Sequence, residues 1–367
     1  MRRRGPGAAG AVWWLAGAVA VLLPLTGCEV PYLLRQGQGQ LDLLLHTRPL
    51  TELVNDKQED GGGWRWALAW SAREFARERL QLTVTDQYER GIEIEGEGVA
   101  WVVSAAGRFD LAPYTWQFPV LGGVPYKGYF DRADAEAEAS RLQGEGLDVL
   151  VRPVTAYSLL GVLPDPLLST MVQGSPERIV EVVIHELAHA TVYAAGQGEF
   201  NEGLATFIGR QGRQAFIVDK LGPDSLALTQ AVQRDADADR YREAVLALSQ
   251  DLASLYASGR ATVAGKQRIF RRHQRAHDEI AASYSTAAYR AARLPDNNAG
   301  VAAMRVYTFN AQLYAKAFAA VGEDWAAFID LLKQVSPSDS ALAHLEHAVR
   351  DRVAQRQGSL RAAPATP

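Results

Sequence analysis

The chain has 367 residues, of which 48% are hydrophobic and 22% charged, with a formal net charge of −4 and a single cysteine. This length supplies a large buried core, and one cysteine cannot form an internal disulfide. A mildly acidic protein lacks the basic surface of nucleic-acid-binding proteins, so the composition argues against nucleic acid as a partner.

The N-terminus has the features of a lipoprotein export signal. Three arginines at positions 2–4 precede an apolar run over residues 8–25, which ends in the sequence Leu-Thr-Gly-Cys at residues 25–28. A charged start, an apolar segment and small residues before a cleavage point are typical of secretory signal peptides. Cys28 stands where a bacterial lipobox has its lipidated cysteine. A plain transmembrane anchor with an incidental cysteine is the alternative.

Cleavage at this cysteine predicts a signal peptide over residues 1–27, a folded domain over 28–357 and a disordered tail over 358–367. Residues 1–27 hold three arginines and no acidic residue, so without them the formal charge changes from −4 to −7. We expect a protein that is exported to the periplasmic side of the cell envelope and anchored in a membrane through lipid on Cys28. Glu29 follows the cysteine in place of an aspartate, which favours the outer membrane.

The first half of the chain contains helices and then strands. Apolar periodicity predicts helices over residues 32–54, interrupted at Pro49, and over 64–82. Alternating apolar residues predict strands over 99–105, 115–120, 126–130 and 148–157. Glycines predict a turn over 122–125, and a short helix is expected over 131–143. Within this part we expect segment 122–130 to be an edge strand, which could bind an extended peptide by strand addition.

The centre of the chain contains an HExxH motif, His185-Glu186-Leu187-Ala188-His189. Residues four apart project from one face of a helix, so the two histidines can present their imidazoles to one metal ion. Glu186 is placed to reach a water molecule at such an ion, and Glu202 can return as a third ligand once the chain turns. Three protein ligands with an open fourth position are typical of a catalytic zinc site.

An ordinary amphipathic helix with satisfied histidines is the alternative interpretation of this motif. The residues before it are strongly apolar, which predicts a helix buried in a core. Two histidines and a glutamate would be costly there without a metal or hydrogen bonds. A second pair of histidines, His273 and His277, is also four apart, but arginines surround it and their charge opposes a cation. We therefore expect the metal site at the HExxH motif.

The second half of the chain is predicted to be mostly helical. Two long, charge-rich helices over residues 225–257 and 262–293 should form a protruding hairpin. Further amphipathic helices are expected over 301–321, 324–334 and 341–355.

Several motifs, taken in order, resemble the bacterial putative-aminopeptidase family of gluzincin-type lipoproteins. They are the lipobox, YKGYFD at 126–131, HELAHATVY at 185–193, FNEGLATFIG at 200–209 and an NNA run at 297–299 that Tyr307 follows. The resemblance extends from about residue 32 to about residue 337. The sequence departs from the family pattern at Gly300-Val301 and in its arginine-rich hairpin.

The resemblance implies an α+β, gluzincin-like zinc peptidase with a small β-sheet beside the HExxH helix and a mostly helical C-terminal half. It implies His185, His189 and Glu202 as Zn²⁺ ligands and Glu186 as the catalytic base. A tyrosine hydroxyl commonly assists the metal in stabilising the oxyanion, and Tyr307 is the first candidate, with packing as its alternative role. Tyr157 and Tyr193 are weaker candidates.

Two asparagines, Asn201 and Asn298, are expected to support the site indirectly or to be structural. A carboxylate that orients His185 or His189 is also expected, but no motif identifies it.

We expect a zinc-dependent metallopeptidase that acts on peptides in the cell envelope. The aminopeptidase assignment comes from the resemblance, because no motif identifies an acid that would hold a free α-amine. One alternative is an endopeptidase with the same metal site. Another is a non-catalytic envelope lipoprotein with a structural zinc. Hydrolysis of a non-peptide amide fits the location, but no motif supports it.

Overall fold

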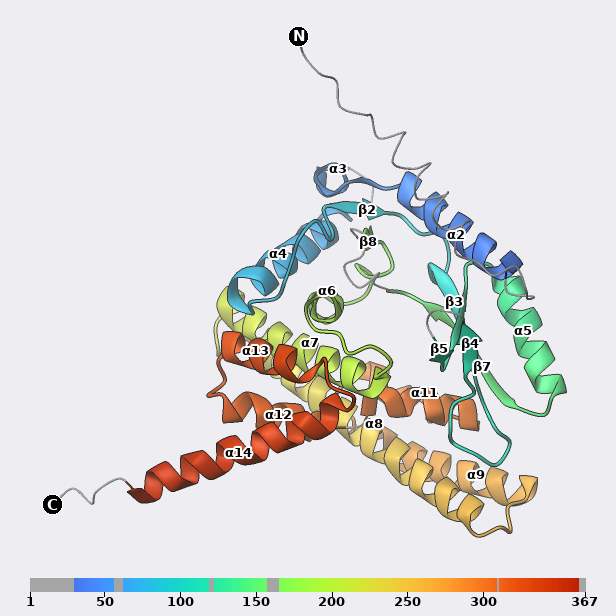
Figure 1. The fold of residues 1–367 in the computed structure, drawn as a ribbon. Coiled ribbons are helices and arrows are strands. Elements are labelled where there is room, and N and C mark those ends of the chain that lie inside the picture. The colour runs from blue at the N-terminus through green and yellow to red at the C-terminus, as the bar shows by residue number, and fades with distance from the viewer. Residues whose placement is uncertain (1–29, 56–61, 119–121, 157–164, 309, 363–367) are drawn as a thin grey trace. The chain divides into compact units, whose positions relative to one another are not determined.

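The computed structural model describes residues 30–55, 62–118, 122–156, 165–308 and 310–362 (Figure 1). The chain divides into two units, one ending at Leu45 and one beginning at His46. The first unit contains helix α2 (Val30–Leu45). Among the described residues, no helix combines the length and the apolar character needed to cross a membrane.

The second unit begins with short elements that pack on helix α4 (Gly63–Arg79). Strand β1 (Arg48–Pro49) interrupts the predicted first helix at Pro49, as expected, and α3 (Leu50–Asn55) follows it. In one sheet, β1 pairs antiparallel with β2 (Arg90–Ile92), which pairs parallel with β8 (Leu167–Leu168).

A second sheet has the order β6-β3-β7, with β3 (Ala100–Ala106) at its centre. Both neighbours, β6 (Lys127–Tyr129) and β7 (Asp148–Val154), are antiparallel to β3. Helix α5 (Arg132–Gly144) covers one face, and α11 (Asn298–Thr308) covers the other. Because both faces are covered, the side chains of residues 102–106 are all buried.

Segment 122–130 contains an edge strand, as predicted, because β6 pairs only with β3 in this sheet. The predicted turn over 122–125 is wrong in part. Gly122–Val124 forms strand β5, which pairs with β4 (Trp116–Phe118) in a separate two-stranded sheet. Glycine allows the extended conformation as well as turns, so the two glycines did not distinguish a strand from a turn.

Helices α6 (Pro176–Thr191) and α7 (Gly198–Leu221) form the core of the second unit. Figure 1 shows α6 end-on, with α4 above it and α7 below it. The resemblance placed a small sheet beside the HExxH helix, whereas the main packing partners of α6 are α4 and α7. The apolar side chains of α6 are buried among helices, while α5 and α11 occupy the sheet faces.

The rest of the chain is helical, and the protein is of the α+β class. Helices α8 (Leu226–Ala257) and α9 (Val263–Ile280) pack against each other as the arms of a hairpin. The second arm is shorter than predicted, because a 3₁₀ turn at Ala281–Ser283 and the short α10 (Ala287–Arg290) follow Ile280.

The predicted helix over 301–321 is divided into α11 and α12 (Ala311–Ala320) near Asn310, which has a left-handed φ of 70°. Helix α13 (Trp325–Val335) follows. Helix α14 (Ala341–Ala362) then continues past residue 357, where we expected the ordered chain to end.

Candidate metal centre

The HExxH motif occupies the C-terminal half of α6. The helix begins at Pro176, which suits a first turn because the N–H that proline lacks would have no intrahelical partner there. Ile179, Val183 and Leu187 are fully buried at four-residue spacing and fix one side of the helix in the core. His185 and His189 follow the same spacing on a neighbouring stripe, so their rings lie together, with centroids 4.9 Å apart.

Glu202 comes from the first two turns of α7 and is positioned by the residue before it. The buried Asn201 side chain accepts a hydrogen bond from the Ala194 N–H and donates one to the Ala194 carbonyl, both at 2.8 Å. These two bonds fix the connection between α6 and α7. Gly196 lies in that connection with a φ of 73°, a conformation that glycine adopts without strain.

Three potential ligand atoms meet between the two helices. His185 Nε2 lies 3.5 Å from Glu202 Oε2, and His189 Nε2 lies 3.8 Å from Glu202 Oε1. One ligand atom from each residue lies within 4.8 Å of the others. Ligands about 2.0–2.2 Å from a tetrahedral zinc are separated by roughly 3.3 Å, so these residues fit such an ion.

The charges of the site act on one another. Burial raises the pKa of Glu202, but the two imidazoles lower it by more, and the net shift is downward. Burial lowers the pKa of His185, but Glu202 and Glu186 outweigh this and raise it. Burial is the main cause that raises the pKa of Glu186. The site therefore favours positive charge at its centre and makes Glu186 a better proton acceptor than an exposed glutamate.

Among the residues that the structure describes, no carboxylate bonds to His189 as an orienting group. The His189 Nδ1 is buried and makes no hydrogen bond to the described residues. Near His185 there is a candidate, because the Glu181 carboxylate contributes to raising the pKa of that histidine. Glu181 lies one helical turn before His185 and pairs with the fully buried Arg213, which also pairs with Asp235.

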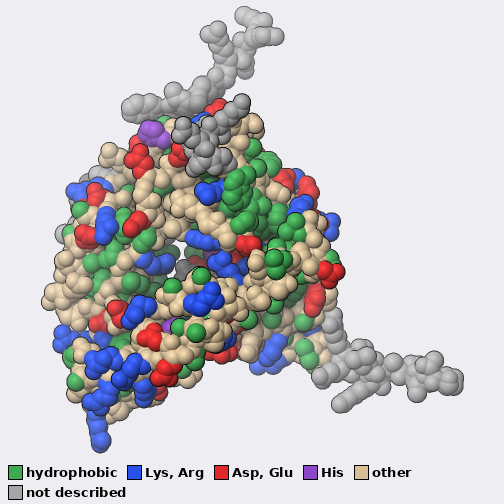
Figure 2. Space-filling view, turned by 180° about the vertical axis from the view of Figure 1, so that it is seen from behind, with side chains coloured by type: hydrophobic (Ala, Val, Ile, Leu, Met, Phe, Trp, Pro, Cys, Tyr) green, Lys and Arg blue, Asp and Glu red, His purple; other side chains and the backbone are tan. Residues whose placement is uncertain are grey.

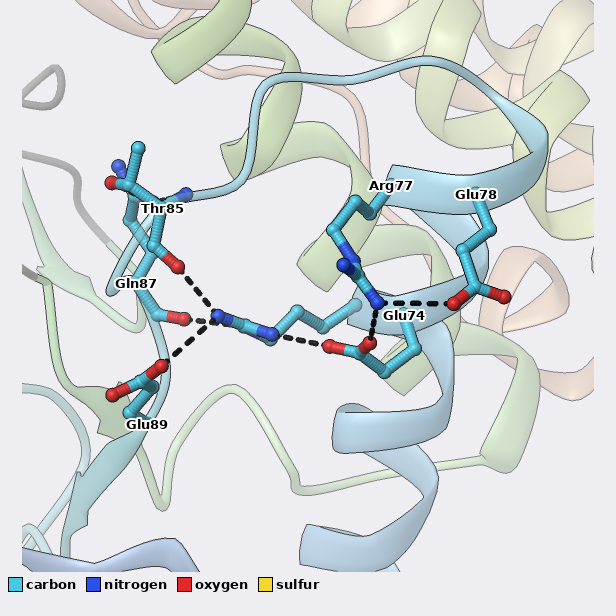
Figure 3. A network of polar contacts seen from close by, with 7 residues as sticks. Glu74, Arg77, Glu78, Thr85, Gln87 and Glu89 are labelled. Atoms are coloured by element: carbon cyan, nitrogen blue, oxygen red, sulfur yellow. Dashed lines mark hydrogen bonds and ion pairs between the residues drawn. The ribbon is translucent and has the colours of Figure 1, made fainter.

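The loop after α4 is tied back to that helix by Arg73, whose side chain is only 5% exposed. Figure 3 labels its partners, Thr85, Gln87 and Glu89 in the loop and Glu74 on the helix. The Arg73 guanidinium donates hydrogen bonds of 2.6 Å to the carbonyls of Thr85 and Gln87. It also pairs with Glu74 and lies 3.7 Å from Glu89. The loop over residues 85–89 is therefore held in a defined position against α4.

This loop brings Tyr88 into the surroundings of Glu186, which the sequence did not suggest. Tyr88 is 2% exposed, and its N–H donates to the carbonyl of Asp165 at 2.8 Å. Burial, followed by the charges of Glu186 and Asp165, raises the pKa of Tyr88 well above its ordinary value. Tyr88 and Asp165 lie in loops without a motif, so no sequence signal could have placed them near Glu186.

Two exposed tyrosines lie on the Glu202 side of the site. Tyr126 directly precedes β6, and Tyr193 lies in the connection between α6 and α7. Burial of its hydroxyl, followed by the charges of Glu202 and Tyr193, raises the pKa of Tyr126. Tyr193 was a candidate from the sequence, whereas Tyr126 was only part of the quoted YKGYFD segment.

The other predicted residues lie elsewhere or outside the described residues. Asn298 is fully buried, and its amide donates to the carbonyls of Gly107, Arg108 and Asp110, so it fixes that loop. Tyr307 belongs to α11, but its side chain is outside the described residues, as are Cys28 and Tyr157. Their predicted roles stay predictions.

The rival histidine pair does not converge on one point. His273 Nε2 lies 2.7 Å from an Asp251 carboxylate oxygen, while His277 Nε2 lies 3.1 Å from the Ala292 carbonyl oxygen. Among the described residues, His185, His189 and Glu202 form the cluster that could hold a metal ion.

Comparison with known proteins assigns the chain to a family. Neither the curated proteins nor the solved structures contain a match. A sequence profile of the family described as "Putative aminopeptidase" matches residues 31–344, which include the HExxH motif and Glu202. This match covers most of the chain, and the chain therefore belongs to the putative aminopeptidase family.

Proposed function

We propose that this protein is a zinc-dependent metallopeptidase with a gluzincin-like site. The observation that carries the proposal is the convergence of His185, His189 and Glu202. Glu186 directly follows His185 in the HExxH motif. Two neutral imidazoles and one carboxylate are a zinc-binding set that leaves a coordination position open. A structural zinc normally has four protein ligands, so this set favours catalysis over a purely structural role.

A zinc ion held by these residues would supply Lewis acidity toward a peptide carbonyl and a water molecule. Glu186 would accept a proton from the attacking water at its carboxylate and deliver it to the leaving amine nitrogen. One C–O bond forms and the C–N bond breaks. The raised pKa of Glu186 suits both transfers. A group that acts first as a base and then as an acid works best when its pKa lies near the working pH.

A hydroxyl donor to the developing oxyanion would come from a tyrosine near Glu202. The charge of Glu202 acts on Tyr126, and Tyr193 in turn lies close enough to Tyr126 to affect it. The side chains of both tyrosines are exposed. Tyr307, the candidate from the family-like motif, is the third tyrosine to be tested. Replacement of each by phenylalanine separates them, since loss of an oxyanion donor lowers kcat by about a hundredfold or more.

Aminopeptidase action is the more specific part of the proposal, and the family supports it. The test compares peptides that have a free N-terminus with the same peptides N-acetylated. An aminopeptidase releases N-terminal residues from the free peptides and leaves the acetylated ones intact. Internal cleavage of the acetylated peptides would instead show the endopeptidase alternative.

We also propose that the protein is exported and anchored through lipid on Cys28. The support is the signal-like sequence over residues 1–28, which lies outside the described residues. Mass spectrometry of the protein from membranes should find a mature chain that begins at an acylated Cys28. An unmodified chain that still carries residues 1–27 would contradict this.

A further inference from the structure

The second arm of the α8–α9 hairpin is strongly basic. Residues 252–277 contain six arginines and lysines and no acidic residue. The whole chain has a formal charge of −4, so the remainder carries −10. Positive charge is therefore concentrated on this segment, within a protein that is otherwise acidic.

The arginines of α9 gather on its outer face. The side chains of Lys266, Phe270 and His277 are buried and mark the inner face. Arg268, Arg271 and Arg275 follow a three- and four-residue spacing on the exposed side, over roughly 10 Å of helix. Arg260 adds a fourth exposed charge in the turn between the two helices. These four arginines are called the cationic face below.

The cationic face is not neutralised by the described residues around it. None of its four side chains forms an ion pair or hydrogen bond among them, whereas their neighbour Arg272 pairs with Asp251. On α9 the nearest acids are Asp278, which accepts a hydrogen bond from Gln274, and Glu279. Figure 2 shows basic side chains gathered at the lower left, where the ends of α8 and α9 lie.

We propose that the cationic face docks on the anionic phospholipid headgroups of a membrane. Guanidinium groups bind phosphate oxygens through paired hydrogen bonds. Three charges within about two turns of α9, with a fourth in the turn before it, match a dense layer of phosphates. A chain anchored by its N-terminus would hold this face at a high effective concentration near the surface. Among the large hydrophobic side chains described on α9, the exposed ones are Val263 and Ile280 at its two ends, so the contact is electrostatic and without insertion.

Fluorescence quenching tests this docking on the full-length chain. A fluorophore is attached to Gln267→Cys, an exposed position of α9, in chains reconstituted into vesicles that carry a headgroup quencher. The vesicles contain phosphatidylcholine with or without phosphatidylglycerol. A label at Ala137→Cys, exposed on α5, is the reference position. We expect strong quenching of the α9 label only with phosphatidylglycerol, and loss of it in 1 M salt, where the screening length is about 3 Å.

Charge reversal supplies the matched variants. Each arginine near an anionic surface strengthens binding about fivefold, so Arg268→Glu, Arg271→Glu and Arg275→Glu together should weaken docking by a hundredfold or more. The same charge change at exposed Lys316, Lys333 and Arg350 should leave it unchanged. Circular dichroism checks that both variants fold.

Equal quenching in both kinds of vesicle would overturn the proposal. Quenching that survives charge reversal on α9 would also overturn it. Docking that requires an added acidic protein or nucleic acid would do the same.

Discussion

Asn201 shows how one side chain can position a ligand that it does not touch. Its amide bonds to both polar groups of Ala194, while the next residue along the chain is Glu202. The direction in which α7 leaves the connection, and hence the position of the Glu202 carboxylate, depends on this pair of hydrogen bonds.

We predict that Asn201→Ala lowers the free energy of unfolding by about 2–4 kcal/mol, because it leaves two buried backbone groups unpaired. Chemical denaturation measures this change. Zinc affinity should also fall, since Glu202 is then less well fixed. A destabilised variant that binds zinc as tightly as the wild type would show that Asn201 is structural only.

Single residues differed greatly in how far the sequence could predict them. The convergence of His185, His189 and Glu202 could be predicted, because a helix brings residues four apart to one face and a turn can return the chain. Tyr88 and Asp165 were not, because two separate loops bring them to Glu186 and the position of a loop depends on tertiary contacts.

At the scale of elements, the site depends on the close approach of α6 and α7. Gly209 lies where an added Cβ would come within 3.1 Å of the Glu181 carbonyl oxygen and 3.3 Å of His185 Cβ. Gly212 is similarly close to Ile184, at 3.0 Å. Glycines on α7 therefore let the backbone of the ligand-bearing helix lie at the distance that the cluster requires.

We predict that Gly209→Val destabilises the protein by about 1–3 kcal/mol through overpacking and weakens zinc binding by displacing His185. The matched control is Gly144→Val at the end of α5, where an added Cβ meets nothing within 4 Å. That control should change stability by no more than about 0.5 kcal/mol. Thermal unfolding and zinc titration of both variants measure these changes. Equal stability and equal zinc affinity of the two variants would contradict close packing of α6 and α7 at Gly209.

Asp237 ties the chain after α9 to helix α8. It accepts hydrogen bonds from the N–H groups of Ser285 and Thr286 and from the Thr286 hydroxyl. Burial raises the pKa of Asp237, but these bonds lower it by more, so its folded pKa lies below the ordinary value. Such a carboxyl contributes stability above its unfolded pKa of about 3.9, and this contribution is lost as the pH falls through the folded pKa.

We predict that Asp237→Asn destabilises the protein by about 1–3 kcal/mol at pH 7, because a charged acceptor is lost. The difference from wild type should shrink as the pH is lowered below about 4. Glu243→Gln, an exposed change on the same helix, should have little effect at either pH. Denaturant unfolding across this pH range gives the result. A difference that does not depend on pH would show that the charge of Asp237 is unimportant.

Among the elements, helices with clear periodicity were predicted well and short pieces were not. The second hairpin arm ends at Ile280 because the following segment bonds to Asp237, a long-range contact that periodicity does not reveal. The strand at Gly122–Val124 depends on its partner β4 in the same way.

At the scale of the whole molecule, the sequence predicted the α+β class and the helical second half, but not the placement of α6. Which helix covers which sheet face is decided by complementary surfaces of distant segments, and the pattern within a segment gives only its buried side. The packing of α6 and the loops around Glu186 are features of this kind, which is why the sequence did not predict them.

Metal analysis combined with peptide hydrolysis, for wild type and Glu186→Gln, is the most direct test of a zinc site with Glu186 as its base. We predict one zinc per chain in both proteins, since Glu186 is not among the three ligands, and turnover of peptides by the wild type alone. Wild-type protein that binds no zinc, or a Glu186→Gln variant that hydrolyses peptides as fast as the wild type, would contradict this prediction.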